Sequence, residues 1–217
     1  MPNTDALAFE HRYQPGAPGS RVTLLLLHGT GGNESALLPL GSAVAPQAAL
    51  LSPRGNVLER GMPRFFRRLA EGVFDLDDLT QRTYELADFV DAAARTYGFD
   101  AAQVVGLGYS NGANIAASLL LLRPQVLAGA ALLRPMLPLV PATPPDLRGK
   151  HVLIAAGQHD SLVPASSTQQ LADLLQQSGT DVTMQWLSAG HGLTSADVAT
   201  VIRWLADRFR IPTAAAP

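Results

Sequence analysis

Short apolar runs alternate with longer stretches of helical periodicity along the whole chain. Several of the runs are continuously hydrophobic, which is typical of parallel strands covered on both faces. The predicted strands are Leu7–Arg12, Val22–Leu27, Ala48–Leu51, Gln103–Leu107, Leu127–Leu132, Val152–Ala156 and Val182–Leu187. The predicted helices are Ser35–Val44, Leu76–Tyr97, Ala113–Leu122, Ala165–Gln177 and Ser195–Arg210. We therefore expect an α/β fold, with a mostly parallel wound sheet of about seven strands and helices on both faces.

Length and composition favour one compact domain. The chain has 217 residues, of which 47% are hydrophobic and 16% charged, enough for a substantial core. The sequence contains neither an internal repeat nor a dividing linker, so we expect one domain over residues 1–217, with a frayed tail at 213–217.

The net charge, the longest apolar run and the N-terminal segment limit the partners and the location that we expect. The formal net charge of −2 gives no electrostatic reason to expect nucleic acid or an anionic membrane. The longest apolar run, Val22–Leu27, is far shorter than the roughly 20 residues of a membrane span, and the N-terminal segment does not resemble a signal peptide. We expect a cytoplasmic protein without stable membrane insertion, and we leave a homodimer open.

The strongest chemical signal is Gly108-Tyr109-Ser110-Asn111-Gly112, which lies between a predicted strand and a predicted helix. A G-x-S-x-G sequence in that context is typical of a nucleophile elbow, a sharp turn that exposes the serine hydroxyl. The alternative is a glycine-rich turn in which Ser110 only caps the helix. The chain contains no cysteine, which excludes a thiol nucleophile.

A serine nucleophile needs a base and an acid that orients the base, in the chain order Ser, acid, His for this fold. We favour His191 as the base, because flanking glycines place it in a loop after a strand; His151 and His159 are the alternatives. Asp160 follows the strand Val152–Ala156 at the carboxyl edge, where active sites of open α/β sheets gather. The alternative for Asp160 is a simple helix cap. Asp197 is a weaker candidate, since its place in the first turn of the last helix suits the helix dipole.

The remaining requirement is an oxyanion hole. His28-Gly29-Thr30-Gly31-Gly32 follows a predicted strand, and we expect the backbone amides of Thr30 and Asn111 to be the two donors. His28 is interpreted as a structural residue that holds this loop by hydrogen bonding.

Two connections, Ser52 to Asp75 and Arg134 to Lys150, are longer than the fold needs. The first follows the third strand at the carboxyl edge, so we expect Met62, Phe65 and Phe66 to line a substrate pocket. The alternative is that these apolar residues anchor the loop to the core. The sequence contains no cluster with metal-ligand spacing, so we expect no metal.

These motifs resemble the phospholipase/carboxylesterase family of α/β-hydrolases, which includes small bacterial carboxylesterases and acyl-protein thioesterases. The resemblance covers almost the whole chain and rests on the segments His28–Gly32, Gly108–Ala113, Gly157–Asp160 with Val163-Pro164, and Gly190-His191. Ser52-Pro53-Arg54-Gly55 and Gly61–Phe66 resemble a hydroquinone-linked bacterial branch of the family. Thr30 stands where several relatives carry leucine or phenylalanine.

The resemblance implies a fold without a lid domain, no cofactor, and hydrolysis of a small-molecule ester with a short or medium acyl chain. The function expected is therefore that of a serine carboxylesterase with Ser110, Asp160 and His191 as catalytic triad. Acyl-protein thioesterase or lysophospholipase activity is the first alternative, since it uses the same triad. The second is a ligand-binding protein that has lost turnover.

Overall fold

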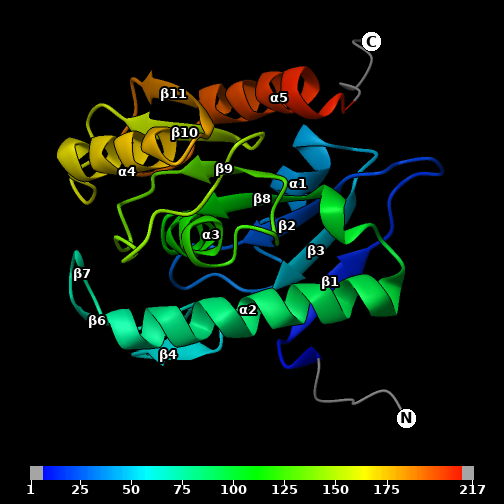
Figure 1. The fold of residues 1–217 in the computed structure, drawn as a ribbon, viewed down its shortest axis with the longest axis horizontal. Helices are drawn as coiled ribbons and strands as arrows, with labels where there is room; N and C mark the ends of the chain where they lie inside the picture. Colours follow the sequence, from blue (N-terminus) through cyan, green and yellow to red (C-terminus); the bar gives the residue numbers. More distant parts are fainter. Residues whose placement is uncertain (1–6, 212–217) are drawn as a thin grey trace.

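A computed structural model describes residues 7–211, and its centre is a seven-stranded sheet (Figure 1). The strands lie in the order β1-β3-β2-β8-β9-β10-β11, in which β1 is antiparallel and the other six are parallel. Their bounds are β1 His11–Gln14, β2 Thr23–Leu27, β3 Ala49–Pro53, β8 Val104–Tyr109, β9 Gly129–Leu133, β10 His151–Gly157 and β11 Asp181–Leu187. The mostly parallel sheet predicted from the sequence is confirmed, whereas the tail predicted at 213–217 lies outside the described residues.

Helices cover both faces of the sheet, as the continuous hydrophobicity of the parallel strands requires. The helices α2 (Leu76–Tyr97), α3 (Asn111–Leu122) and α4 (Ala165–Gln177) pack on one face, and α1 (Leu38–Val44) and α5 (Ser195–Phe209) on the other. Capping residues set several helix ends: Asp75 accepts from the amide of Asp78 at the start of α2, and Gly98 ends that helix in the left-handed conformation.

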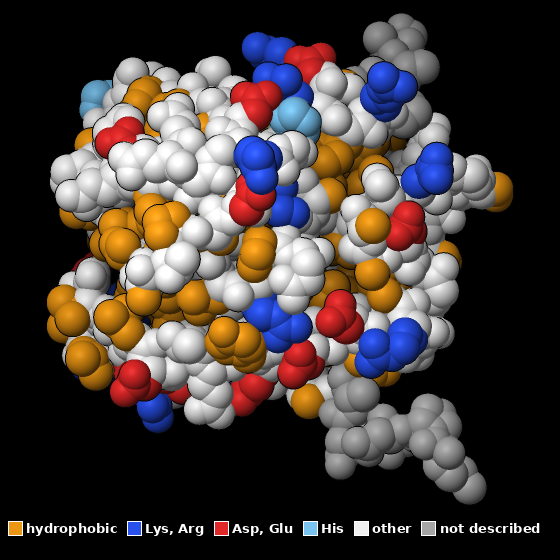
Figure 2. All heavy atoms as spheres, viewed as in Figure 1, with side chains coloured by type: hydrophobic (Ala, Val, Ile, Leu, Met, Phe, Trp, Pro, Cys, Tyr) orange, Lys and Arg blue, Asp and Glu red, His pale blue; other side chains and the backbone are white. Residues whose placement is uncertain are grey.

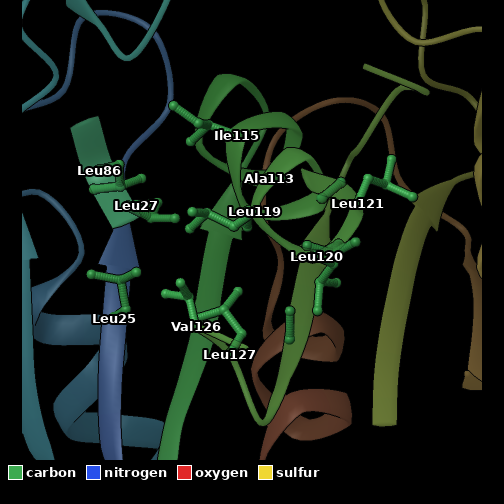
Figure 3. Packing of buried hydrophobic residues seen from close by; sticks show 14 of the residues in the cluster. Leu25, Leu27, Leu86, Ala113, Ile115, Leu119, Leu120, Leu121, Val126 and Leu127 are labelled. Carbon is green, nitrogen blue, oxygen red and sulfur yellow. The ribbon is translucent and has the colours of Figure 1, made fainter. Parts of the chain in front are cut away.

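The larger hydrophobic core lies between the sheet and α2, α3 and α4. Figure 3 shows Leu25 and Leu27 of β2 in one cluster with Leu86 of α2 and Leu119 of α3, and all four side chains are buried. The whole of α3 except its last residue is buried. Because α3 begins directly after Ser110, this packing fixes the position of that serine relative to the sheet.

Most element boundaries lie within two residues of the sequence prediction, and two differ by more. The first strand was expected at Leu7–Arg12 but begins at His11, because the side chain of Phe9 is buried against Phe89 before the chain joins β3 at the sheet edge. The first helix was expected from Ser35 but begins at Leu38, where Pro39 occupies the first turn.

The connection from Ser52 to Asp75 is more ordered than the sequence suggested. It contains two short hairpins, β4 (Val57–Glu59) with β5 (Met62–Arg64), and β6 (Arg68–Ala70) with β7 (Val73–Phe74). The arrows of β8 to β11 point to the left in Figure 1, toward the side where β6 and β7 lie. The hairpins therefore stand at the carboxyl edge of the sheet.

The surface carries mixed charge. Figure 2 shows basic and acidic side chains interspersed on one face, with hydrophobic side chains gathered at the left, over the region where Figure 1 places β6, β7 and the start of α2. The exposed apolar residues of that region include Leu69, Val73 and Leu76. Within residues 7–211, no helix is both long and apolar enough to span a bilayer.

Candidate functional site

Ser110 occupies a strained turn between β8 and α3. Its backbone has φ 52° and ψ −114°, a conformation that costs a non-glycine residue free energy and is typical of a nucleophile elbow. The glycines on either side are sterically required: a Cβ on Gly112 would lie 1.9 Å from the carbonyl oxygen of Leu27, and one on Gly108 would lie 2.5 Å from that of Gly112. Ser110 makes no capping hydrogen bond with its side chain. The hydroxyl is therefore available for another partner.

That partner is His191, which also hydrogen-bonds to Asp160. The Ser110 hydroxyl lies 3.0 Å from His191 Nε2, and His191 Nδ1 lies 2.8 Å from Asp160 Oδ2. Because a carboxylate can only accept, Nδ1 carries the proton and Nε2 of the neutral ring is left to accept from serine. The structure thus brings together the three residues selected from the sequence, in a continuous hydrogen-bonded chain.

Asp160 is held by the turn that follows β10. Its side chain is 2% exposed, and its Oδ1 accepts from the amides of Leu162 and Val163 at 2.9 and 3.1 Å. This leaves Oδ2 directed at the imidazole. Of the alternative histidines, His159 is exposed, and His151 bonds Asp181 at the opposite end of β10.

The loop that carries His191 is anchored by a buried arginine that was not among the residues selected from the sequence. Arg134 follows β9 with a positive φ of 56°, and its side chain is 0% exposed. Its guanidinium donates to the carbonyls of Gly190 and Gly192 at 2.9 and 3.2 Å, and forms a two-pronged pair with Asp197 at 2.7 and 3.0 Å. The carbonyls on both sides of His191 are therefore held by one cation.

Two neighbouring contacts complete this anchor. The Tyr109 hydroxyl donates to the carbonyl of His191 itself at 3.2 Å, and Asp197 also forms a capping box with Thr194 at the start of α5. Asp197 thus does more than serve the helix dipole, the only role expected for it from the sequence. The signal that could have found this pair was an arginine placed directly after a buried strand, where an unpaired charge would be costly.

Replacing Arg134 by methionine should lower the free energy of unfolding by about 3–5 kcal/mol, because Asp197 would remain as a buried, unpaired charge. We also expect kcat to fall, since the backbone on both sides of His191 loses its donors. Chemical denaturation and ester hydrolysis measure the two effects. Arg208→Met is the matched control, because it removes a half-exposed pair with Asp181 and should cost at most about 1 kcal/mol. Equal losses in the two variants would contradict the anchoring role.

His28 holds the loop after β2, as expected from the sequence. The amide of Gly55 donates to His28 Nε2 at 3.0 Å, so the proton lies on Nδ1, which donates to the carbonyl of Gly29 at 2.7 Å. Burial lowers the pKa of His28, against a smaller opposing effect of the Gly29 carbonyl. The neutral ring therefore links the glycine-rich loop to the chain that follows β3.

The two predicted oxyanion donors lie at the same cavity as Ser110. Among residues 7–211, the backbone amides of Thr30 and Asn111 donate to no protein acceptor. The next amide, that of Gly31, donates to the carbonyl of Pro63 at 2.9 Å, whereas the amide of Ser110 donates to that of Leu133. The Asn111 side chain accepts from the amide of Phe65 at 2.8 Å. The turns around both free amides are thus fixed by hydrogen bonds.

A cavity of about 310 Å³ opens above Ser110, within the usual range for small-molecule sites. It is lined by residues from the elbow, the glycine-rich loop, both long connections and the turns after β10 and β11. These residues are Thr30, Arg64, Arg68, Glu71, Gly72, Phe74, Tyr109, Ser110, Asn111, Asn114, Arg134, Met136, Leu162, Val163 and His191.

The predicted pocket residues Met62, Phe65 and Phe66 require a correction. Phe65 and Phe66 are 1% and 0% exposed and belong to the core, so the alternative of loop anchors describes them. Met62 is 40% exposed beside Gly31, but it does not line the cavity. The connection nevertheless reaches the cavity through Arg64, Arg68, Glu71, Gly72 and Phe74. The apolar character of Phe65 and Phe66 reflects their place in the core and not a place at the pocket.

No group of three or more His, Asp or Glu side chains suited to a metal ion occurs in the described part of the chain. Asp197 and Asp160, two acids close to the site, are instead engaged by an arginine and by backbone amides.

Comparison with known proteins shows similarity over almost the whole chain. A sequence model of a family described as phospholipase/carboxylesterase matches residues 14–208. The putative hydrolase MhqD of Bacillus subtilis (strain 168) is 49% identical over 195 residues, which cover 90% of this chain and 96% of that protein. The crystal structure of a Bacillus cereus carboxylesterase is 50% identical, covers 93% of this chain and 95% of its own, and superposes with a TM-score of 0.91. A carboxylesterase from Mesorhizobium loti is 37% identical, with 94% and 97% coverage and a TM-score of 0.88.

Proposed function

Because the chain belongs to the phospholipase/carboxylesterase family of hydrolases, we propose that it is a serine carboxylesterase in which Ser110 is the nucleophile. The single observation that carries this proposal is the hydrogen-bonded chain from Ser110 through His191 to Asp160, built on a strained turn. A turn that only capped α3 would use the Ser110 side chain as a helix cap, which it does not do.

In the first half of the reaction, His191 Nε2 takes the hydroxyl proton as Ser110 Oγ attacks the ester carbonyl carbon. The carbonyl oxygen becomes negatively charged and accepts from the amides of Thr30 and Asn111. The imidazolium then donates its proton to the alcohol oxygen as the carbon–oxygen bond breaks. Asp160 stabilises the imidazolium through Nδ1 and does not itself take the proton.

In the second half, His191 removes a proton from water, and the resulting hydroxide oxygen attacks the acyl-enzyme carbonyl. The same two amides stabilise the second oxyanion. Return of the proton to Ser110 Oγ releases the carboxylic acid and restores the starting state. One water is consumed, and one acid and one alcohol are formed, with no redox change.

We expect short to medium acyl chains to react best. The cavity is small and open, and its apolar lining is limited to Phe74, Met136, Leu162, Val163 and part of Tyr109. Burial of each methylene contributes roughly 0.8 kcal/mol and should raise kcat/KM about fourfold. The increase should stop once the acyl chain covers all of the apolar lining. A series of p-nitrophenyl esters from acetate to palmitate measures this as a rise over a few carbons followed by a plateau or fall.

Phe74→Ala should flatten that rise more than it lowers acetate hydrolysis, since Phe74 lines the cavity. Phe99→Ala is the matched control, because Phe99 packs near Tyr13 and does not line that cavity. A wild-type optimum at palmitate would contradict the proposed chain length and favour the thioesterase or lysophospholipase alternative.

A further inference from the structure

A buried arginine without a full set of partners lines the cavity. Arg64 at the end of β5 is 3% exposed, yet its side chain reaches the same cavity as Ser110. Its Nη1 donates to the Thr30 hydroxyl at 2.6 Å, and its Nε donates to the carbonyl of Phe66 at 3.2 Å. Within the described residues, Nη2 has no acceptor. A guanidinium offers five N–H donors in a fixed plane, so part of this one is left for another group.

The charge of Arg64 is only partly balanced. Glu59 lies 3.2 Å from Arg64 Nε, but the same carboxylate is held more closely by Arg68, at 2.9 to 3.0 Å. Burial lowers the pKa of Arg64, the nearby Arg68 lowers it further, and Glu59 opposes both. Two guanidinium groups thus share one carboxylate at the edge of the cavity.

The other charged side chains that line the cavity do not neutralise the excess positive charge of Arg64 and Arg68. Arg134 is neutralised by its own partner Asp197, so it neither adds to nor removes the excess. Glu71 lines the cavity but is exposed, and water screens its charge. The Asn114 side chain accepts from the amide of Met136 at 2.8 Å, which leaves its NH₂ group as a further donor at the cavity. The unused polar groups at this cavity are mainly donors.

We propose that this donor set binds a carboxylate on the acyl part of the substrate, so that the preferred substrates are half-esters of dicarboxylic acids. The inference rests on the proposed ester hydrolysis at Ser110. The acyl part is assigned by geometry: the alcohol oxygen must lie at His191 to receive its proton, whereas Arg64 contacts Thr30, the oxyanion donor. An arginine matches a carboxylate in shape as well as in charge. Its position at the cavity therefore favours an acyl group that ends in a carboxylate over one that ends in a methyl group.

The test compares monoethyl adipate with ethyl hexanoate, two ethyl esters of equal chain length that end in a carboxylate and in a methyl group. Wild-type kcat/KM should be at least about tenfold higher for monoethyl adipate, as a charge-assisted hydrogen bond allows. Arg64→Met should remove this preference, mainly through KM, while Arg64→Lys keeps part of it. Arg148→Met is the control for net charge, because Arg148 is 82% exposed and, within residues 7–211, pairs only with Asp146.

Inhibition by free carboxylic acids, which carry no ester bond to hydrolyse, is a second test of the same site. Adipate should inhibit the wild-type enzyme competitively, and more strongly than hexanoate, with an inhibition constant that rises with salt. Glu59→Gln should strengthen inhibition by adipate, because it removes the shared counter-charge from Arg64. This variant acts in the opposite direction to Arg64→Met, so a general loss of folding cannot imitate the pattern.

The outcomes separate this inference from the proposed function. Equal loss of both substrates in Arg64→Met would overturn the inference, since Arg64 would then only hold Thr30. A wild-type preference for ethyl hexanoate would also overturn it, although hydrolysis through Ser110 would stand. Failure to hydrolyse either ester would overturn the proposed function as well.

Discussion

Replacement of Ser110 by alanine should lower kcat for ester hydrolysis by about 10⁶-fold, because no other group can form the acyl-enzyme. The fold should remain intact, since the Ser110 hydroxyl makes no capping bond to α3 and, among residues 7–211, hydrogen-bonds only to His191. The amides of Thr30 and Asn111 would persist, so a residual acceleration of roughly 10³-fold over water is expected. Kinetics with p-nitrophenyl butyrate and thermal unfolding measure the two properties.

Ser166→Ala is the matched control, because Ser166 is exposed on α4. It should keep wild-type activity. Activity near the wild-type level in Ser110→Ala would end the proposed mechanism, whatever the effect on stability.

Replacement of Asp160 by asparagine should lower kcat by up to about 10⁴-fold. The amides of Leu162 and Val163 require an acceptor at Oδ1, so the side-chain oxygen of asparagine would occupy that position. Its NH₂ group would then face His191 Nδ1 and force this atom to accept. The proton of the neutral ring would move to Nε2, which could then no longer receive a proton from Ser110.

Asp173→Asn is the control for a carboxylate-to-amide change, since Asp173 is on α4 and, in the described part of the chain, bonds only to Gln169. The two variants should have similar stability. A loss of kcat in Asp160→Asn smaller than about tenfold would show that the orientation of His191 does not depend on this carboxylate.

Features that depend on residues close together in the chain were predictable from the sequence. The elbow is an example: Gly108 and Gly112 are needed because a Cβ at either position would collide with backbone, and this requirement is visible as a local pattern. The long buried strands were predictable because parallel strands covered on both faces must be apolar throughout. The edge strand β1 was misplaced because none of its residues is fully buried: half-buried and exposed side chains alternate along it, so its hydrophobic pattern is weak.

Contacts between residues distant in sequence could not be predicted in the same way. Arg134 meets Asp197 and Arg64 meets Thr30 only after the sheet and hairpins have formed. An arginine is usually exposed, so its residue type does not predict burial; the place of Arg134 directly after a buried strand was the only sequence signal for either residue. The prediction of Phe65 as a pocket residue was wrong for a related reason, because its contacts are also with residues distant in sequence. Its ring packs in the core, and only its backbone amide, which donates to Asn111, contacts the site.

Labelling with a fluorophosphonate tests the central claim most directly, because the reagent forms a covalent bond only with an activated serine. We predict one adduct per chain by intact mass, located at Ser110 by peptide mass spectrometry, with loss of esterase activity in proportion to labelling. His191→Ala should label far more slowly at the same residue. An adduct at another serine, or full esterase activity in protein without an adduct at Ser110 after complete exposure, would contradict the assignment of Ser110 as nucleophile.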